Sequence, residues 1–76
     1  MKDFVLYIAQ ALAEFPGEIR VTEIHGQQTS ILELRSSPKD IGRLIGRSGK
    51  TIGALRTLLG NLAAKQKRRA VLEVAE

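Results

Sequence analysis

A turn with two glycines joins two apolar segments near the middle of the chain, and its residues could bind an anion. Residues 45–52 read Ile-Gly-Arg-Ser-Gly-Lys-Thr-Ile, a G-x-x-G pattern. Gly46 can end one helix in the left-handed conformation, and Gly49 can let the next begin at once with free N–H groups. Arg47 and Lys50 add positive charge to the positive end of the helix dipole. The pattern therefore predicts a polyanion site, with a nucleic-acid strand as the obvious candidate.

Positive charge is concentrated in the same half of the chain. The protein has a formal net charge of +4 and a sequence pI of about 10.0. Residues 39–69 hold nine basic residues and one acidic residue, whereas the rest of the chain is acidic on balance. Such segregation favours a polyanion-binding face, because phosphate neutralisation supplies most non-specific affinity. A basic surface that is only solvated is the alternative.

Size and composition predict one small domain, residues 1–76, with an economical core. The chain is 43% hydrophobic and has no cysteine, which excludes disulfides and thiolate-bound metal and fits a cytoplasmic setting. The N-terminal residues imitate a signal peptide, but Asp3 and Gln10 interrupt the apolar run, and cleavage would remove the first helix. No segment is long enough to span a bilayer, so we expect no membrane partner.

The glycine patterns do not match nucleotide-binding loops. Residues 49–51, Gly-Lys-Thr, imitate the end of a Walker A loop, but that loop needs a glycine where Leu44 stands. Gly42, Gly46 and Gly49 also lack the G-x-G-x-x-G spacing of dinucleotide-binding turns. Neither pattern supports an enzyme.

Catalytic and metal-binding clusters are equally hard to assemble. The single histidine, His25, falls at a predicted turn, and we interpret it as an exposed loop residue. Asp40 is the only carboxylate of the basic segment, and we expect it to favour the N-terminus of its own short helix. The sequence therefore predicts no enzyme, no cofactor, no metal and no small-molecule substrate.

Hydrophobic periodicity and turn residues predict an α+β fold with elements in the order α-β-β-α-α-β. Apolar side chains recur at helical spacing or alternate as in strands, and Pro16-Gly17 and Ser36-Ser37-Pro38 mark boundaries. The expected elements are a helix over residues 3–15, a hairpin of strands 19–24 and 30–35, a short helix from the serine cap to Ile45, a longer helix over 50–66, and a strand over 70–75.

The three aromatic residues all fall in the first predicted helix. Phe4 and Phe15 are expected in or beside the core, and Tyr7 lies off the main apolar stripe. Such a chain has no sheet aromatics for stacking bases, unlike RRM, OB and cold-shock modules. Nucleic-acid binding would therefore have to use backbone contacts and an aliphatic groove.

A stripe of small residues runs along the longer helix at intervals of four, three and four: Gly53, Thr57, Gly60 and Ala64. Glycine in a helix costs about 1 kcal/mol relative to alanine, and close approach of another backbone could compensate. The stripe could pack against the domain's own sheet or first helix, or it could form a dimer interface. Both interpretations are open at this point.

The turn and the element order together resemble one known family. Residues 45–52, set between two helices, match the I-G-x-x-G-x-x-I signature of KH domains at every defining position. The order α-β-β-α-α-β is similar to the type II, prokaryotic arrangement and covers essentially the whole chain. The chain most resembles the small stand-alone bacterial KH proteins of the KhpA type. This implies one KH domain, with a three-stranded sheet covered on one face by helices.

The resemblance implies a non-catalytic protein that clamps about four nucleotides of single-stranded RNA by its backbone. The implied RNA-binding residues are the turn Gly46, Arg47, Ser48 and Gly49, the anchors Ile45 and Ile52, and the groove residues Arg43, Lys50 and Arg56. Relatives are described as homodimers, or as heterodimers with a larger KhpB/Jag-type KH protein, in RNA regulation linked to cell division and envelope growth. A dimeric post-transcriptional regulator or RNA chaperone is the function that this implies.

Two other functions and one charged segment stay open. The chain could be a protein-interaction subunit that works through the small-residue stripe. It could also be a DNA-binding helix-turn-helix that reads bases with the helix from Lys50, although few side chains there suit base edges. The basic run Lys65, Lys67, Arg68 and Arg69 could extend the electrostatic track or only solvate the helix end.

Overall fold

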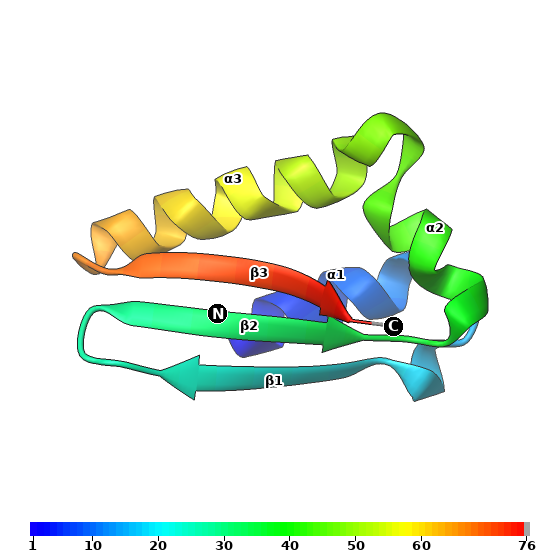
Figure 1. Cartoon of the computed structure of the whole chain (residues 1–76), viewed down its shortest axis with the longest axis horizontal. Coiled ribbons are helices and arrows are strands. Elements are labelled where there is room, and N and C mark those ends of the chain that lie inside the picture. Colours follow the sequence, from blue (N-terminus) through cyan, green and yellow to red (C-terminus); the bar gives the residue numbers. More distant parts are fainter. Residues whose placement is uncertain (76) are drawn as a thin grey trace.

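The computed structural model describes residues 1–75 and shows a three-stranded sheet with helices on one face (Figure 1). Its main elements are α1 (Lys2–Leu12), β1 (Arg20–His25), β2 (Thr29–Arg35), α2 (Ile41–Ile45), α3 (Lys50–Lys65) and β3 (Arg69–Ala75). Three short 3-10 turns connect them: η1 (Pro16–Glu18), η2 (Pro38–Asp40) and η3 (Arg47–Gly49). The predicted α+β class and the order α-β-β-α-α-β are confirmed.

The sheet is mixed, with the strand order β1-β2-β3. The hairpin pairs β1 with β2 in antiparallel register, and the helical crossover through α2 and α3 returns the chain parallel to β2 as β3. Side chains alternate along each strand, so Leu32 and Leu34 of β2 and Leu72 of β3 point into the core. Within residues 1–75 the opposite face of the sheet carries no helix, and α1 and α3 both pack on the inner face (Figure 1).

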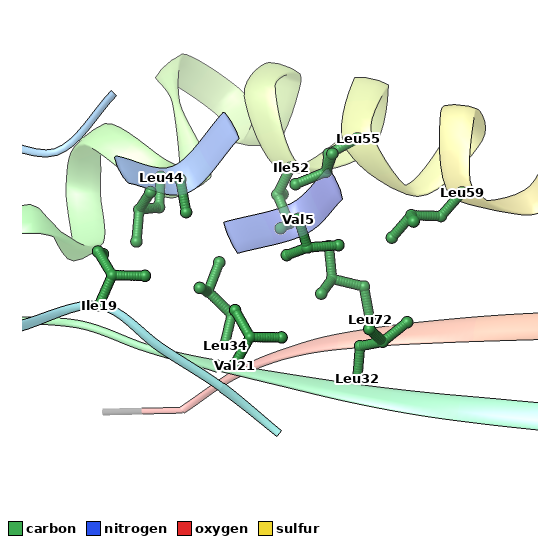
Figure 2. Packing of buried hydrophobic residues seen from close by; sticks show 11 residues of the cluster. Val5, Ile19, Val21, Leu32, Leu34, Leu44, Ile52, Leu55, Leu59 and Leu72 are labelled. Atoms are coloured by element: carbon green, nitrogen blue, oxygen red, sulfur yellow. The ribbon is translucent and has the colours of Figure 1, made fainter. Parts of the chain in front are cut away.

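The core lies between the sheet and the helices (Figure 2). Helical side chains that are almost completely buried are Val5 and Ala9 of α1, Leu44 of α2, and Ile52, Leu55, Leu59 and Ala63 of α3. Two residues that the periodicity placed on inner helix faces are more exposed than expected: Leu12 at 40% and Leu62 at 38%. Both lie near helix ends, where neither the sheet nor the other helix covers them.

Asp40 shapes the junction between the first helix and the second half of the chain. Its side chain is fully buried and accepts hydrogen bonds of 2.9 Å from the backbone N–H groups of Glu14 and Phe15. Asp40 is the N-cap residue of α2, at the helix N-terminus where the sequence placed it, but its carboxylate makes no cap hydrogen bond there and bonds instead to the end of the first helix. The first helix also ends at Leu12, earlier than predicted, since residues 14 and 15 bond to Asp40.

The helical segment after β2 begins at the predicted serine cap, but its first turn is the 3-10 helix η2, and α2 follows from Ile41. The Ser37 hydroxyl oxygen accepts a hydrogen bond of 3.3 Å from the Lys39 backbone N–H, and Pro38 occupies the first turn. Among residues 1–75, none of the helices combines the length and hydropathy needed to cross a bilayer.

Candidate nucleic-acid interface

The G-x-x-G turn projects between α2 and α3 and has an unusual backbone. Gly46 has φ 80° and ψ 170°, Ser48 has φ 56° and ψ 29°, and Gly49 has φ 74° and ψ 15°. Three of four consecutive residues therefore have positive φ, a conformation that side chains with a β-carbon rarely adopt. The left-handed conformation that the sequence suggested for Gly46 occurs instead at Gly49, the residue that precedes α3. Gly46 also has positive φ, but its extended ψ belongs to a region that is essentially restricted to glycine.

The two glycines are required for different reasons. A β-carbon at Gly46 would lie 2.7 Å from the β-carbon of Thr51 and 2.8 Å from its backbone nitrogen, so the first glycine allows α2 and α3 to meet closely. A β-carbon at Gly49 would have no neighbour within 4 Å. The second glycine therefore leaves an open surface where a phosphate could approach the backbone. Among the described residues, no side chain makes a cap hydrogen bond at the N-terminus of α3, which follows Gly49.

The isoleucines on either side hold the turn to the core. Ile52 is 6% exposed and belongs to the buried cluster, and Ile45 is half-buried against the same cluster. Their anchoring position is the one expected from the sequence. The side chains between them, Arg47 and Ser48, are exposed, as is Lys50 at the start of α3.

The four predicted basic residues differ in how they are held. Within the described residues, Arg47 and Lys50 form no ion pair, so both charges are available to a ligand. Arg43 lies 3.5 Å from Glu14 and 3.7 Å from Asp40, which partly neutralise it. Arg56 of α3 donates a hydrogen bond of 3.1 Å from Nε to the Leu72 carbonyl oxygen of β3. The structure thus gathers Arg47 and Lys50 at the turn, and it places Arg56 at the seam between α3 and the edge strand.

Arg68, at the end of the basic run, has a structural role that the sequence did not reveal. Its guanidinium donates to the carbonyl oxygens of Gly26 and Gln27 and to the Ser30 hydroxyl at 2.9 to 3.0 Å, and it contacts His25 Nδ1 at 3.1 Å. It therefore holds the β1–β2 loop against the end of α3. The interpretation of His25 as exposed is confirmed, but it lies at the end of β1 and contacts both Arg68 and Glu23.

The small-residue stripe faces away from the core. Gly53, Thr57, Gly60 and Ala64 are all exposed, and a β-carbon at either glycine would have no neighbour within 4 Å. The alternative in which the stripe packs against the domain's own sheet or first helix is therefore wrong. The exposed glycines are available for contact with another chain.

An apolar pocket lies beside this stripe, between α1 and α3. It has a volume of about 350 Å³, and its lining is Ile8, Lys50, Thr51, Ala54, Leu55 and Leu58. Leu58 is 50% exposed at its edge, and Tyr7 of α1, at 72%, is also exposed as the sequence predicted. The outer surface of the helices is thus more apolar than the turn. Within the described part of the chain, no three His, Asp or Glu side chains gather as metal ligands would.

The element order, the mixed sheet and the G-x-x-G turn between α2 and α3 together define a KH fold of the type II arrangement. The family model described as "KhpA/KhpB, KH domain" matches residues 2–74. The chain belongs to this family of KH domains.

Full-length similarity to individual proteins agrees with that assignment. An "RNA-binding protein KhpA" from Chlamydia pneumoniae is 43% identical over 76 residues, which cover 100% of this chain and 97% of the relative. Proteins with the same description from Caldanaerobacter subterraneus subsp. tengcongensis and Aquifex aeolicus are 42% and 41% identical, and the matches cover 97% and 100% of this chain and 99% and 96% of the relatives. No solved structure matches the chain at a significant level.

Proposed function

We propose that this chain is a non-catalytic RNA-binding protein that holds single-stranded RNA at the turn of residues 46–49. The observation that carries the proposal is the open backbone at Gly49 between Arg47 and Lys50, which are exposed and have no ion-pair partner among residues 1–75. A phosphate can approach this backbone without meeting a side chain, and the two cations and the N-terminus of α3 favour negative charge there. The names of the relatives, which call them RNA-binding proteins, support RNA as the polyanion.

The clamp extends over about four nucleotides, as in KH modules generally. From the turn, the bases would lie along α3 toward β3, where Arg56 borders the groove. Ile45 and Ile52 keep the turn in place, and Arg43 contributes charge at its α2 side. The DNA-reading alternative has less support, because the family match covers nearly the whole chain and α2 has only five residues.

A double variant tests the clamp. Arg47→Asp with Ser48→Asp places two carboxylates where phosphate would sit, and binding to a labelled single-stranded oligonucleotide should fall at least about tenfold in fluorescence anisotropy. Lys2→Asp with Gln28→Asp changes the net charge equally at exposed sites away from the turn, so it should retain most of the affinity. If both variants lost the same amount of affinity, net charge alone would explain the loss, and this result would contradict the clamp. Circular dichroism checks the fold of each.

A single KH module binds weakly, so dimerisation would raise avidity through effective concentration. We infer that the exposed stripe of Gly53, Thr57, Gly60 and Ala64 is the dimer interface, because a β-carbon at either of its glycines would meet no atom of residues 1–75 within 4 Å. The partner is a second copy or a larger KhpB/Jag-type KH protein, and RNA chaperoning or post-transcriptional regulation is the resulting activity.

Gly60→Leu tests this interface. The added side chain projects into open space in the monomer, so folding should persist while sedimentation velocity shows loss of the dimer. Gly17→Leu, at a glycine with equally open space in η1 and outside the stripe, is the matched control. A Gly60→Leu protein that stays dimeric contradicts the interface. If RNA binding survives the Arg47→Asp/Ser48→Asp change but Gly60→Leu abolishes function in cells, the protein-interaction alternative takes precedence.

A further inference from the structure

The helix-free face of the sheet carries a row of apolar side chains, of which two are exposed and the middle one is half-buried. Ile24 of β1 pairs in register with Ile31 of β2, and Ile31 pairs with Val71 of β3. The buried residues Val21, Leu32 and Leu72 lie an odd number of positions from Ile24, Ile31 and Val71 along the same strands. Because side chains alternate along a strand, these three residues point away from the helices. Ile24 is 62% exposed and Val71 is 38% exposed. In Figure 1 the strands lie in front of α1 and no helix covers them from the viewer's side.

Charges of opposite sign lie on the two sides of this apolar row. Along the outer side of β3 the order is Arg69, Val71, Glu73, and both charged residues are exposed. On one side of the row, Glu73 lies in register with Glu33. Glu33 pairs with Arg35 at 2.8 Å, whereas Glu73 and Arg69 form no ion pair within residues 1–75. Glu33 and Glu73 are like charges side by side on one sheet face, which is unfavourable. Within residues 1–75, no cation pairs with Glu73 to offset this repulsion.

We propose that a second copy of this chain docks face to face on the outer surface of the sheet. A two-fold axis that runs across the strands along the apolar row places Val71 over the partner subunit's Val71. The same rotation reverses the strand direction, so Glu73 faces Arg69 of the partner subunit, and Arg69 faces the partner subunit's Glu73. Sheets that pack in this way lie about 10 Å apart, a distance that these side chains can span. The surface is therefore complementary to itself.

Charge complementarity favours a second copy of this chain in the arrangement described, over other arrangements of two copies and over RNA. A two-fold axis parallel to the strands would put the row of Glu33 and Glu73 onto the same row of the partner, which is repulsive. RNA is disfavoured for the same reason, since phosphates would meet both carboxylates. Three apolar side chains bury far less than the roughly 1,600 Å² of a standard interface, so the association is weak and depends on concentration. It leaves the small-residue stripe and the turn at residues 46–49 uncovered, because both belong to the helical layer.

Charge exchange tests the contact without any RNA. Glu73→Arg would place arginine against the partner's Arg69, and Arg69→Glu would place glutamate against the partner's Glu73, so each change alone should abolish self-association at this face. The combined variant exchanges the two partners and should restore it. Within one molecule, Glu73→Arg puts a cation in register with Glu33, which should favour the sheet. A loss of self-association in this variant would therefore not come from unfolding.

The measurement is sedimentation velocity over a concentration series from about 20 µM to 1 mM at low salt, where surface ion pairs are least screened. Each variant is made both in the natural sequence and with Gly60→Leu, which removes any contact through the stripe. The weight-average sedimentation coefficient should rise with concentration for Gly60→Leu alone and for the combined exchange, but not for either single change. Absence of self-association in Gly60→Leu, or a combined exchange that fails to restore it, would overturn the proposal.

A cross-linking experiment tests the geometry independently. The chain has no cysteine, so one introduced thiol reports one position. Val71→Cys lies on the proposed axis and should form a covalent dimer rapidly with a short bis-maleimide. Glu18→Cys, an exposed position in η1, is the control and should react with the reagent without forming a dimer at a comparable rate. Equal dimer yields from the two positions would contradict the face-to-face arrangement.

Discussion

Gly46 and Thr51 meet so closely across the turn that a β-carbon on the glycine would lie 2.7 Å from the threonine β-carbon. Thr51 belongs to the first turn of α3, and Gly46 ends α2 with φ 80°. The contact therefore sets how closely α2 and α3 approach. The two glycines of the turn therefore differ in what requires them. Gly46 is needed because of this contact, whereas a β-carbon at Gly49 would meet no atom within 4 Å.

Gly46→Ala should be much more destabilising than Gly49→Ala. The first change combines a glycine-only conformation with a steric conflict, and we expect a loss of about 3 kcal/mol in the free energy of unfolding. The second places alanine in a left-handed conformation without a clash and should cost about 1 kcal/mol. Urea unfolding followed by circular dichroism gives both values. Gly42→Ala, inside α2 with open space around its β-carbon, should be neutral or stabilising. Equal costs at Gly46 and Gly49 would contradict the role of Thr51.

Asp40→Asn should destabilise the fold by about 2 to 4 kcal/mol. The buried carboxylate accepts two hydrogen bonds of 2.9 Å from the N–H groups of Glu14 and Phe15. An amide would offer one oxygen and turn an NH₂ group toward an N–H donor, leaving buried donors without partners. Asp3→Asn, an exposed change of the same chemistry in α1, should cost less than about 1 kcal/mol. Urea unfolding of both variants measures the difference, and similar values would contradict the stabilising role of the hydrogen bonds that Asp40 accepts.

The local features of this chain were predictable from its sequence, but the contacts between distant segments were not. The change from helical to alternating periodicity gave the six elements, and the glycines located the turn, because both depend on near neighbours in the chain. Asp40 bonds to residues 25 and 26 positions away, and Arg68 reaches a loop 41 and 42 positions away. Nothing in the residue pattern around Asp40 or Arg68 encodes such partners.

Because contacts between distant segments were not predictable, the sequence also misjudged how exposed some helix residues are and how freely the basic residues of the site are held. Periodicity correctly separated the two sides of α3, but it could not tell how far the sheet extends beneath Leu62. It also could not decide whether the small-residue stripe faced the sheet or solvent. The sequence counted both Arg43 and Arg47 as RNA-binding residues, whereas the fold places two carboxylates near Arg43 and, within residues 1–75, no ion-pair partner near Arg47.

Lys67→Gly should stabilise the protein. Lys67 has φ 57° just after α3, where its N–H bonds to the Ala64 carbonyl oxygen and the Arg68 N–H bonds to that of Ala63, at 3.0 and 2.8 Å. This is a Schellman cap, whose left-handed position normally holds glycine. Removing the β-carbon should gain about 0.5 to 1 kcal/mol of unfolding free energy in thermal or urea unfolding. Lys65→Gly removes the same charge inside the helix and should instead cost about 1 kcal/mol. A loss at both positions would contradict the cap.

Salt dependence should rank the basic side chains by how freely they reach phosphate. For single-stranded RNA, each phosphate contact contributes about −0.7 to the slope of log affinity against log salt. Arg47→Ala and Lys50→Ala should each make the slope shallower by about that amount, because neither side chain has an ion-pair partner within the described residues. Arg43→Ala should change it less, since Glu14 and Asp40 already neutralise part of its charge.

Fluorescence anisotropy with one labelled oligonucleotide, measured from about 50 to 300 mM salt, gives these slopes. Lys2→Ala, an exposed change at the start of α1, should leave the slope unaltered and serves as the control for net charge. If Arg43→Ala reduced the slope more than Arg47→Ala did, the phosphates would follow α2 rather than the turn. The open backbone at Gly49 would then not be the main contact, because a clamp centred there depends first on the two cations beside it.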